Sequence, residues 1–124
     1  MEYEVIRSQI ISKSNGYQAV PDGQGGRRIT KSAQVRAYEK EFARQCSIYR
    51  DRNISRPFIL HLVVYESSWA YDLDGAFKVL LDMLQTVHAI KNDNLCVGIH
   101  AVKRIDRDNP RILYALQETE PTLF

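Results

Sequence analysis

The stretch Tyr71-Asp72-Leu73-Asp74-Gly75-Ala76-Phe77-Lys78-Val79-Leu80-Leu81-Asp82-Met83-Leu84 organises the chain. Two aspartates, Asp72 and Asp74, stand two residues apart directly after an extended apolar run, and Lys78 follows four residues after the second. Carboxylates are hard oxygen ligands that suit Mg²⁺ or Mn²⁺, and a lysine is a cation that suits phosphate. The stretch therefore indicates metal-assisted chemistry on a phosphodiester.

The residues around the two aspartates predict a strand followed by a helix. Residues 58–65 are apolar on both alternating faces, which favours a central strand covered on both sides. A helix over about residues 74–88 is predicted by an apolar stripe at helical spacing: Phe77, Leu80, Leu81, Leu84 and Val87. On that helix Asp74, Lys78 and Asp82 fall at positions i, i+4 and i+8, so they share one face.

The N-terminal part predicts a strand, a loop and a helix. Residues 3–11 are rich in β-branched and aromatic types, which indicates a first strand. Residues 12–31 are polar, glycine-rich and basic, so we expect a long loop that either follows a phosphate backbone or is a surface excursion. Ser32 is a plausible N-cap for a helix to about residue 49. Its expected buried stripe is Val35, Tyr38, Phe42 and Tyr49.

The remaining residues complete a single-domain prediction. Asp93 lies in the polar turn 91–94, followed by a strand over 95–105, a hairpin turn at 107–110 and a return strand over 111–117. The tail, residues 118–124, is expected to be loosely held. We therefore expect one α+β domain over residues 1–124, with a small mixed β-sheet packed with two main helices.

Composition narrows the class of protein. The net charge of +2 is too small to indicate nucleic acid, but a basic segment over residues 27–52 precedes an acidic cluster around Asp72, which fits a protein that binds a polyanion and gathers cations. The basic residues at helical spacing, Arg36, Lys40 and Arg44, either pair with nearby glutamates or lie along a nucleic-acid backbone.

The sequence also bears on the cellular compartment. Cys46 and Cys96 have no metal-ligand spacing, so we expect reduced thiols. We find no signal-peptide core and no apolar run near the roughly 20 residues of a membrane span, so we expect a soluble, cytoplasmic protein.

The motif Asp72-Leu73-Asp74, then Lys78, then Leu81-Asp82-Met83-Leu84, then Asp93, resembles the RusA-like Holliday junction resolvases. The pattern of that family is Asp-Leu-Asp-Asn, a lysine four residues after the second aspartate, Leu-Asp-Ala-Leu, and later a pair of acids. The resemblance covers most of the chain, and its specificity lies in residues 72–93.

The resemblance implies a homodimeric, Mg²⁺-dependent endonuclease without an organic cofactor that cuts branched DNA at four-way junctions, with Mn²⁺ as a possible substitute. Asp72, Asp74 and Asp93 would hold the metal, and Lys78 would contact the scissile phosphate. The residues expected to contact DNA are Arg27, Arg28, Lys31 and Lys103. A dimer would supply two identical sites to match the near-twofold symmetry of a junction.

Two positions depart from the family pattern. Gly75 stands where the family usually has asparagine, and Asn92 stands where it usually has the first acid of the pair. The second departure leaves open a relative that binds junctions but is catalytically weak. A further alternative is a small domain in which Asp74 is a helix-terminal acid, Lys78 its i+4 partner and Asp93 a turn residue.

The path of the chain back to Asp93 raises a geometric question. A helix over residues 74–88 is about 21 Å long, and five further residues span at most about 18 Å. Asp93 returns to the pair only if the helix ends early or bends, or if it acts across a dimer interface. Because Thr86-Val87-His88 is weakly helical, we expect an early end.

Overall fold

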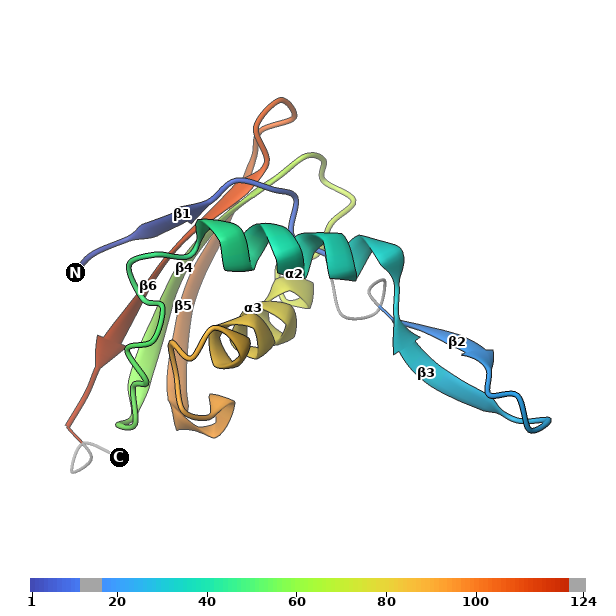
Figure 1. Cartoon of the computed structure of the whole chain (residues 1–124). Coiled ribbons are helices and arrows are strands. Elements are labelled where there is room, and N and C mark those ends of the chain that lie inside the picture. Colours follow the sequence, from blue (N-terminus) through green and yellow to red (C-terminus); the bar gives the residue numbers. More distant parts are fainter. Residues whose placement is uncertain (12–16, 121–124) are drawn as a thin grey trace.

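Figure 1 shows the computed structural model of the chain, which describes residues 1–11 and 17–120. The described residues form an α+β domain with a mixed four-stranded sheet, a two-stranded sheet and two α-helices. In chain order the elements are β1 (Glu4–Ile6), β2 (Tyr17–Pro21), β3 (Arg27–Lys31), α2 (Ala33–Gln45), β4 (Phe58–Glu66), α3 (Gly75–Thr86), a 3₁₀ turn η1 (Asp93–Leu95), β5 (Cys96–Ile105) and β6 (Arg111–Glu118). The predicted fold class is therefore confirmed.

Strand β4 is central in the larger sheet, whose order is β1-β6-β4-β5. β5 runs parallel to β4 and β6 runs antiparallel to it. The predicted hairpin of β5 with β6 is wrong, because β4 lies between the two strands. The connection over residues 106–110 instead passes the end of β4, where the Asp106 amide donates to the Glu66 carbonyl at 2.9 Å. β5 pairs with one edge of β4, and β6 pairs with the other.

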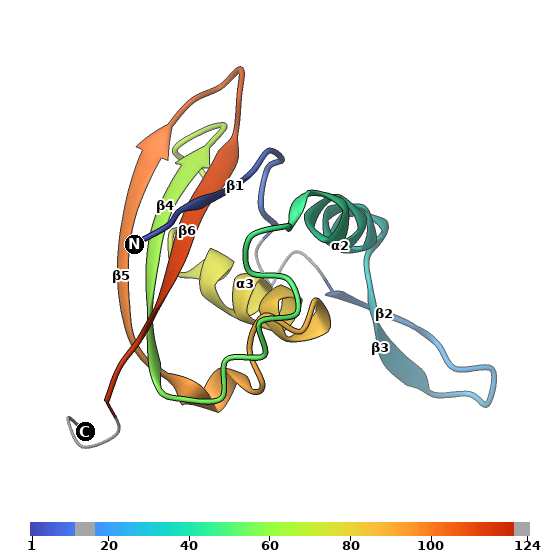
Figure 2. The ribbon, with the colours of Figure 1, turned by 60° about the vertical axis from the view of Figure 1, so that its left-hand side comes forward.

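Both helices, α2 and α3, lie on the same face of this sheet in the two views of Figures 1 and 2. The inward side chains of β4 are buried: Phe58, Leu60, Leu62, Val64 and Glu66. The alternating side chains Ile59, His61, Val63 and Tyr65 are only partly buried. The prediction that β4 is covered on both sides is therefore wrong, although its central position is right. A sheet with antiparallel pairs, such as β4 with β6, can pack one face on the core and leave the other facing solvent.

Residues 17–31 form the hairpin β2–β3, which extends away from the sheet and helices (Figures 1 and 2). The prediction of a long loop over residues 12–31 is therefore wrong for residues 17–31, and residues 12–16 lie outside the described residues. Asp22 closes the turn, since its Oδ1 accepts from the amides of Gln24 at 2.7 Å and Gly26 at 3.0 Å. Gly23 and Gly25 adopt positive φ angles of 82° and 87° in this turn.

Helix α2 begins as predicted and ends earlier. The Ser32 hydroxyl accepts from the Val35 amide at 3.2 Å, which is an N-cap bond. The helix ends at Gln45 rather than near Tyr49, yet Tyr49 is still buried. The predicted stripe of Val35, Tyr38 and Phe42 is buried as well.

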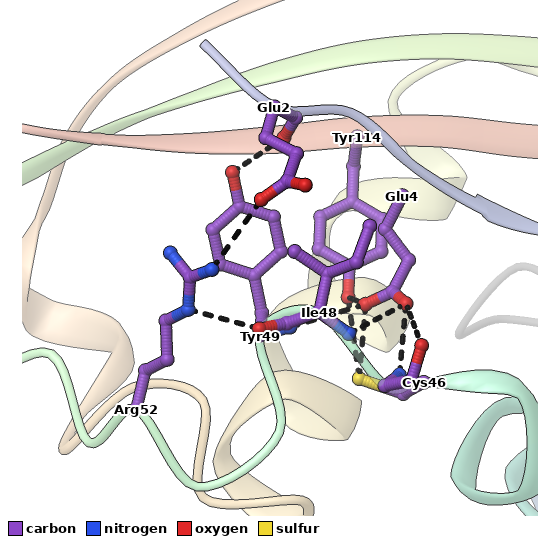
Figure 3. Close-up of polar contacts among 8 residues, drawn as sticks. Glu2, Glu4, Cys46, Ile48, Tyr49, Arg52 and Tyr114 are labelled. Atoms are coloured by element: carbon purple, nitrogen blue, oxygen red, sulfur yellow. Dashed lines mark hydrogen bonds and ion pairs between the residues drawn. The ribbon is translucent and has the colours of Figure 1, made fainter.

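A buried carboxylate joins the first strand to the segment that follows α2 (Figure 3). Glu4 is 3% exposed and accepts from the amides of Ser47 at 2.8 Å, Ile48 at 2.9 Å and Tyr49 at 3.3 Å. The Tyr114 hydroxyl on β6 donates to the same carboxylate at 2.9 Å. Glu4 therefore fixes three separate segments in one place.

The Cys46 thiol also donates to Glu4, at 3.4 Å. Burial is the main reason that the pKa of this thiol is raised to about 11. Cys46 and Cys96 are both free, as predicted. No helix among residues 1–11 and 17–120 is both long and apolar enough to cross a bilayer.

The predicted loose tail begins later than residue 118. Glu118 is the last residue of β6, and the Thr119 amide donates to the Pro57 carbonyl at 2.8 Å. Glu120 pairs with Arg56 at 2.9 Å. Residues 121–124 lie outside the described part of the chain, so the tail prediction is corrected for residues 118–120 only.

Candidate active site

The two aspartates of the motif lie where the loop after β4 enters helix α3. Both are exposed. Asp74 is the N-cap residue of α3, but its side chain makes no capping hydrogen bond. The first turn is closed instead by backbone bonds from the Ala76 amide to the Leu73 carbonyl and from the Phe77 amide to the Asp74 carbonyl, each at 3.2 Å. The Asp74 carboxylate is therefore not used by its own helix.

The loop that carries Asp72 is held at both ends. At its start, the Gln9 side chain accepts from the Ser67 amide at 2.8 Å and donates to the Glu66 carboxylate. Near its end, Lys103 Nζ on β5 donates to the carbonyl of Trp69 at 3.2 Å and to the carbonyl of Tyr71. Because Tyr71 directly precedes Asp72, Lys103 fixes the backbone beside the first aspartate.

Lys78 and Asp93 are brought together within one chain. Lys78 Nζ lies 2.7 Å from Asp93 Oδ2 and 3.0 Å from Asp82 Oδ1. Among the described residues its carboxylate partners are therefore Asp82 and Asp93, and not Asp74, the helix-terminal partner that sequence spacing also allowed. The hydrogen bond that Lys78 donates to Asp93 is the main cause of the raised pKa of Lys78, so this ammonium stays protonated.

The early end of α3 answers the geometric question about Asp93. The helix stops at Thr86, and His88 takes a positive φ of 59°. The Ala89 amide then donates to the Leu84 carbonyl at 2.9 Å, a bond typical of a Schellman-type helix end. The chain turns back along the helix, where the Gln85 side chain accepts from the Asp93 amide at 2.8 Å.

Asn92, the departure from the family pattern, has a local structural role. Its Oδ1 accepts from the Asn94 amide at 3.0 Å, so it caps the 3₁₀ turn that begins at Asp93. An aspartate accepts the same bond, because the cap needs only an oxygen acceptor. Asparagine and aspartate at position 92 would therefore differ in charge but not in their ability to cap the turn.

The proposed metal ligands are not gathered into one group in this structure. Within residues 1–11 and 17–120, no three side chains of the types His, Cys, Asp or Glu lie together in a way that could hold a metal ion. Asp72 and Asp74 share the start of α3, whereas Asp93 is paired with Lys78 one turn further along. The donor set nevertheless fits a hard divalent cation, since all its groups are carboxylates and two are exposed.

Sequence reasoning did not predict that Glu66 is buried at the start of the loop. Glu66 is 1% exposed, and burial is the main reason that its pKa is raised, although Gln9 and Lys103 act in the opposite direction. The Tyr38 hydroxyl is buried and has no hydrogen-bond partner among the described residues. A signal for Glu66 was present, because it occupies an inward position in the alternation of β4.

The basic residues expected to bind DNA lie in different surroundings. Arg27 and Arg28 are exposed on β3, and Lys31 at the end of that strand pairs with Glu39 at 2.9 Å. Lys103 is directed to loop carbonyls. In the basic ridge of α2, Arg44 pairs with Glu41 at 2.7 Å. Pairing with glutamates, one of the two alternatives for that ridge, is therefore present for Arg44.

Comparison of the chain with models of known protein families and with curated proteins gives no match. The assignment of a function consequently depends on the motif and on the geometry described above.

Proposed function

We propose that the protein is a metal-dependent, structure-selective endodeoxyribonuclease that resolves four-way DNA junctions by paired hydrolysis of phosphodiesters. The observation that carries the proposal is the ion pair of Lys78 with Asp93, at 2.7 Å. It joins residues 15 positions apart beside the helix start that carries Asp72 and Asp74. Helix spacing alone does not set this pair, because Asp93 lies beyond the end of α3.

Asp72, Asp74 and Asp93 would hold Mg²⁺ or Mn²⁺. When bound, such an ion supplies Lewis-acid stabilisation of charge on the phosphate and a water of lowered pKa. The two exposed carboxylates are suited to this role because neither is consumed by a helix cap. Lys103 and Gln9 would contribute indirectly, since they fix the loop that presents Asp72.

Lys78 would stabilise negative charge that builds on the scissile phosphate. Its two carboxylate neighbours, Asp82 and Asp93, keep the ammonium protonated and hold it in place until a phosphate replaces one of them. Removing one such electrostatic group typically costs about 10²- to 10³-fold in rate. Asp82 would then be a positioning residue, because its contact is with Lys78.

The partners proposed are branched DNA and a second copy of the chain. Arg27, Arg28 and Lys31 on the extended hairpin would contact phosphates, so binding should weaken as salt is raised. A homodimer would place two sites on one junction and permit paired cuts. Its test is the molar mass of the protein in solution, alone and with junction DNA.

The test of the enzyme is cleavage of an end-labelled four-way junction in the presence of Mg²⁺. We expect symmetric nicks with the wild type, none with Asp72→Asn, and a rate about 10²- to 10³-fold lower with Lys78→Met. The matched control is Asp108→Asn, which removes an exposed acid in the turn between β5 and β6 and should cut normally.

A junction-binding protein with weak catalysis is the second candidate, favoured by Asn92, which occupies the position of the first acid of the family pair as a turn cap. Retained junction binding without nicks in the wild type, with either Mg²⁺ or Mn²⁺, would support it over the enzyme. Cleavage that is unchanged in Asp72→Asn would count against the proposed site itself. Absence of any junction preference would reject both candidates.

A further inference from the structure

Trp69 is the one tryptophan of the chain, and it is exposed. It lies in the loop between β4 and α3, and 76% of its surface is in contact with solvent. Indole is a large apolar group that normally gains free energy from burial, and tryptophan is enriched at interfaces. Packing within the domain therefore does not account for the position of Trp69.

The loop around Trp69 is fixed by several hydrogen bonds. Lys103 Nζ donates to the Trp69 carbonyl at 3.2 Å, and the Ala70 amide donates to the Ser68 hydroxyl at 3.3 Å. Gln9 holds the start of the same loop through the Ser67 amide. A side chain on a backbone held in this way loses little conformational freedom when it binds a ligand.

Lys103 also gives the indole a positively charged neighbour. Its Nζ lies 5.5 Å from the centroid of the Trp69 ring, within the range of a cation–π interaction. The same ammonium bonds to the carbonyl of Tyr71, the residue before Asp72. Lys103 therefore contacts both the exposed indole and the backbone directly before Asp72. It also places a positive charge beside the indole ring.

We propose that Trp69 is a stacking platform for an unpaired nucleobase at the branch point of the DNA, held beside the phosphate that Asp72 and Lys78 address. This inference rests on the proposed function, because it needs DNA at that site. An aromatic plane accepts the π-face of any base, and a cation next to it favours the attached phosphate. Trp69 would then favour DNA in which a base is free to leave the stack, and it would disfavour a continuous duplex.

The indole is its own reporter, because the chain has no other tryptophan. We would titrate the wild type with a four-way junction in EDTA, which prevents cleavage, and follow tryptophan emission together with the anisotropy of a labelled junction. The comparison ligand is a linear duplex of the same sequence and length. We expect the junction to quench the emission and the duplex to leave it nearly unchanged.

Three variants test the contribution to binding. Replacing a stacking aromatic by alanine typically weakens binding about 5- to 150-fold, so we expect that loss for Trp69→Ala in the anisotropy titration. Trp69→Phe keeps an aromatic plane and should retain most of the affinity. The control is Tyr3→Ala, which removes an exposed aromatic next to β1 and should bind as the wild type does. Circular dichroism verifies that each variant is folded.

The outcomes separate the two proposals. Junction binding with unchanged emission, and with equal affinity of Trp69→Ala and wild type, would overturn the stacking role and leave the proposed function intact. Equal quenching by junction and duplex would show that no unpaired base is needed, which also overturns it. If neither DNA binds at any salt concentration, the stacking role and the proposed function both fail.

Discussion

Glu4→Gln is expected to destabilise the fold by an amount set by the donors around the carboxylate. Oε2 accepts from the amides of Ser47 and Ile48, whereas Oε1 accepts from the Tyr49 amide and the Tyr114 hydroxyl (Figure 3). A glutamine that keeps its one oxygen at the Oε2 position places its NH₂ group at the Oε1 position. The Tyr114 hydroxyl can rotate and accept a hydrogen bond from this NH₂ group. The Tyr49 amide can only donate, so it loses its acceptor.

One buried amide donor is then unsatisfied, and the remaining bonds lose the help of a negative charge. An unsatisfied donor costs about 1–3 kcal/mol and each hydrogen bond to a charged group contributes about 1.5–3 kcal/mol, so we expect a loss of about 2–4 kcal/mol for Glu4→Gln. Glu4→Ala leaves all the donors without the carboxylate and should cost more. Against a total stability of about 5–15 kcal/mol, either loss is large.

The effect of pH follows from the direction of the pKa shift. Burial by itself raises the pKa of Glu4, but the bonds from Ile48, Ser47, Tyr114 and Tyr49 outweigh it and hold the pKa below its usual value. A depressed folded-state pKa contributes stability above the pKa of the unfolded chain, and this stability is lost as the pH falls through the folded-state value. The difference between wild type and Glu4→Gln should therefore be full at pH 7 and shrink below about pH 4.

The assay is urea unfolding at pH 7 and at several values below pH 5, with unchanged m-values as the check of two-state behaviour. The matched control is Glu2→Gln, since Glu2 is largely exposed and pairs with Arg52 only at 3.5 Å. The control should lose less than about 1 kcal/mol. A loss in Glu4→Gln as small as in the control, or one independent of pH, would refute the reasoning.

Two further predictions concern the helix ends. Ser32→Ala removes the cap bond to the Val35 amide and should lower the free energy of unfolding by about 1 kcal/mol, measured by urea titration against Ser55→Ala, an exposed serine outside the helices. His88→Gly should raise the free energy of unfolding by up to about 1 kcal/mol, because glycine adopts the φ of 59° without a steric penalty. A lower melting temperature for His88→Gly would show that the imidazole contributes more than the backbone strain costs.

Local patterns predicted β4, α3 and the N-cap of α2 correctly. The apolar run and length of β4, the helical spacing of apolar residues in α3 and the Ser32 cap are each properties of neighbouring residues, so sequence is sufficient for them. Of the stripe predicted for α3, Leu80, Leu84 and Val87 are buried, whereas Phe77 and Leu81 are only partly buried. The hairpin β2–β3 was missed because its strands are short and lack the apolar alternation that marks a half-buried strand, and β3 is mostly exposed. Its turn chemistry at Asp22 was the available signal.

For the candidate site, sequence predicted the shared face of Lys78 and Asp82, which i,i+4 spacing requires on any helix. It did not predict the contact of Lys78 with Asp93. That contact depends on where α3 ends and on the bond from the Asp93 amide to Gln85, which together direct the chain back along the helix. The weakly helical Thr86-Val87-His88 predicted the early helix end, but the bond to Gln85 joins residues beyond that end to the helix, and no local pattern indicates it.

The sequence by itself determined the two helices, the central strand and the spacing of the acidic motif, because these follow from periodicities of 3.6 and 2 residues along the chain. Only the tertiary structure decided that β5 and β6 pair with β4 and not with each other, that Lys103 holds the loop before Asp72, and that Trp69 is exposed beside it. The physical reason is that strand pairing and long side-chain contacts join residues tens of positions apart. Their free energy depends on which partners the packed core brings within reach, and no local pattern records that choice.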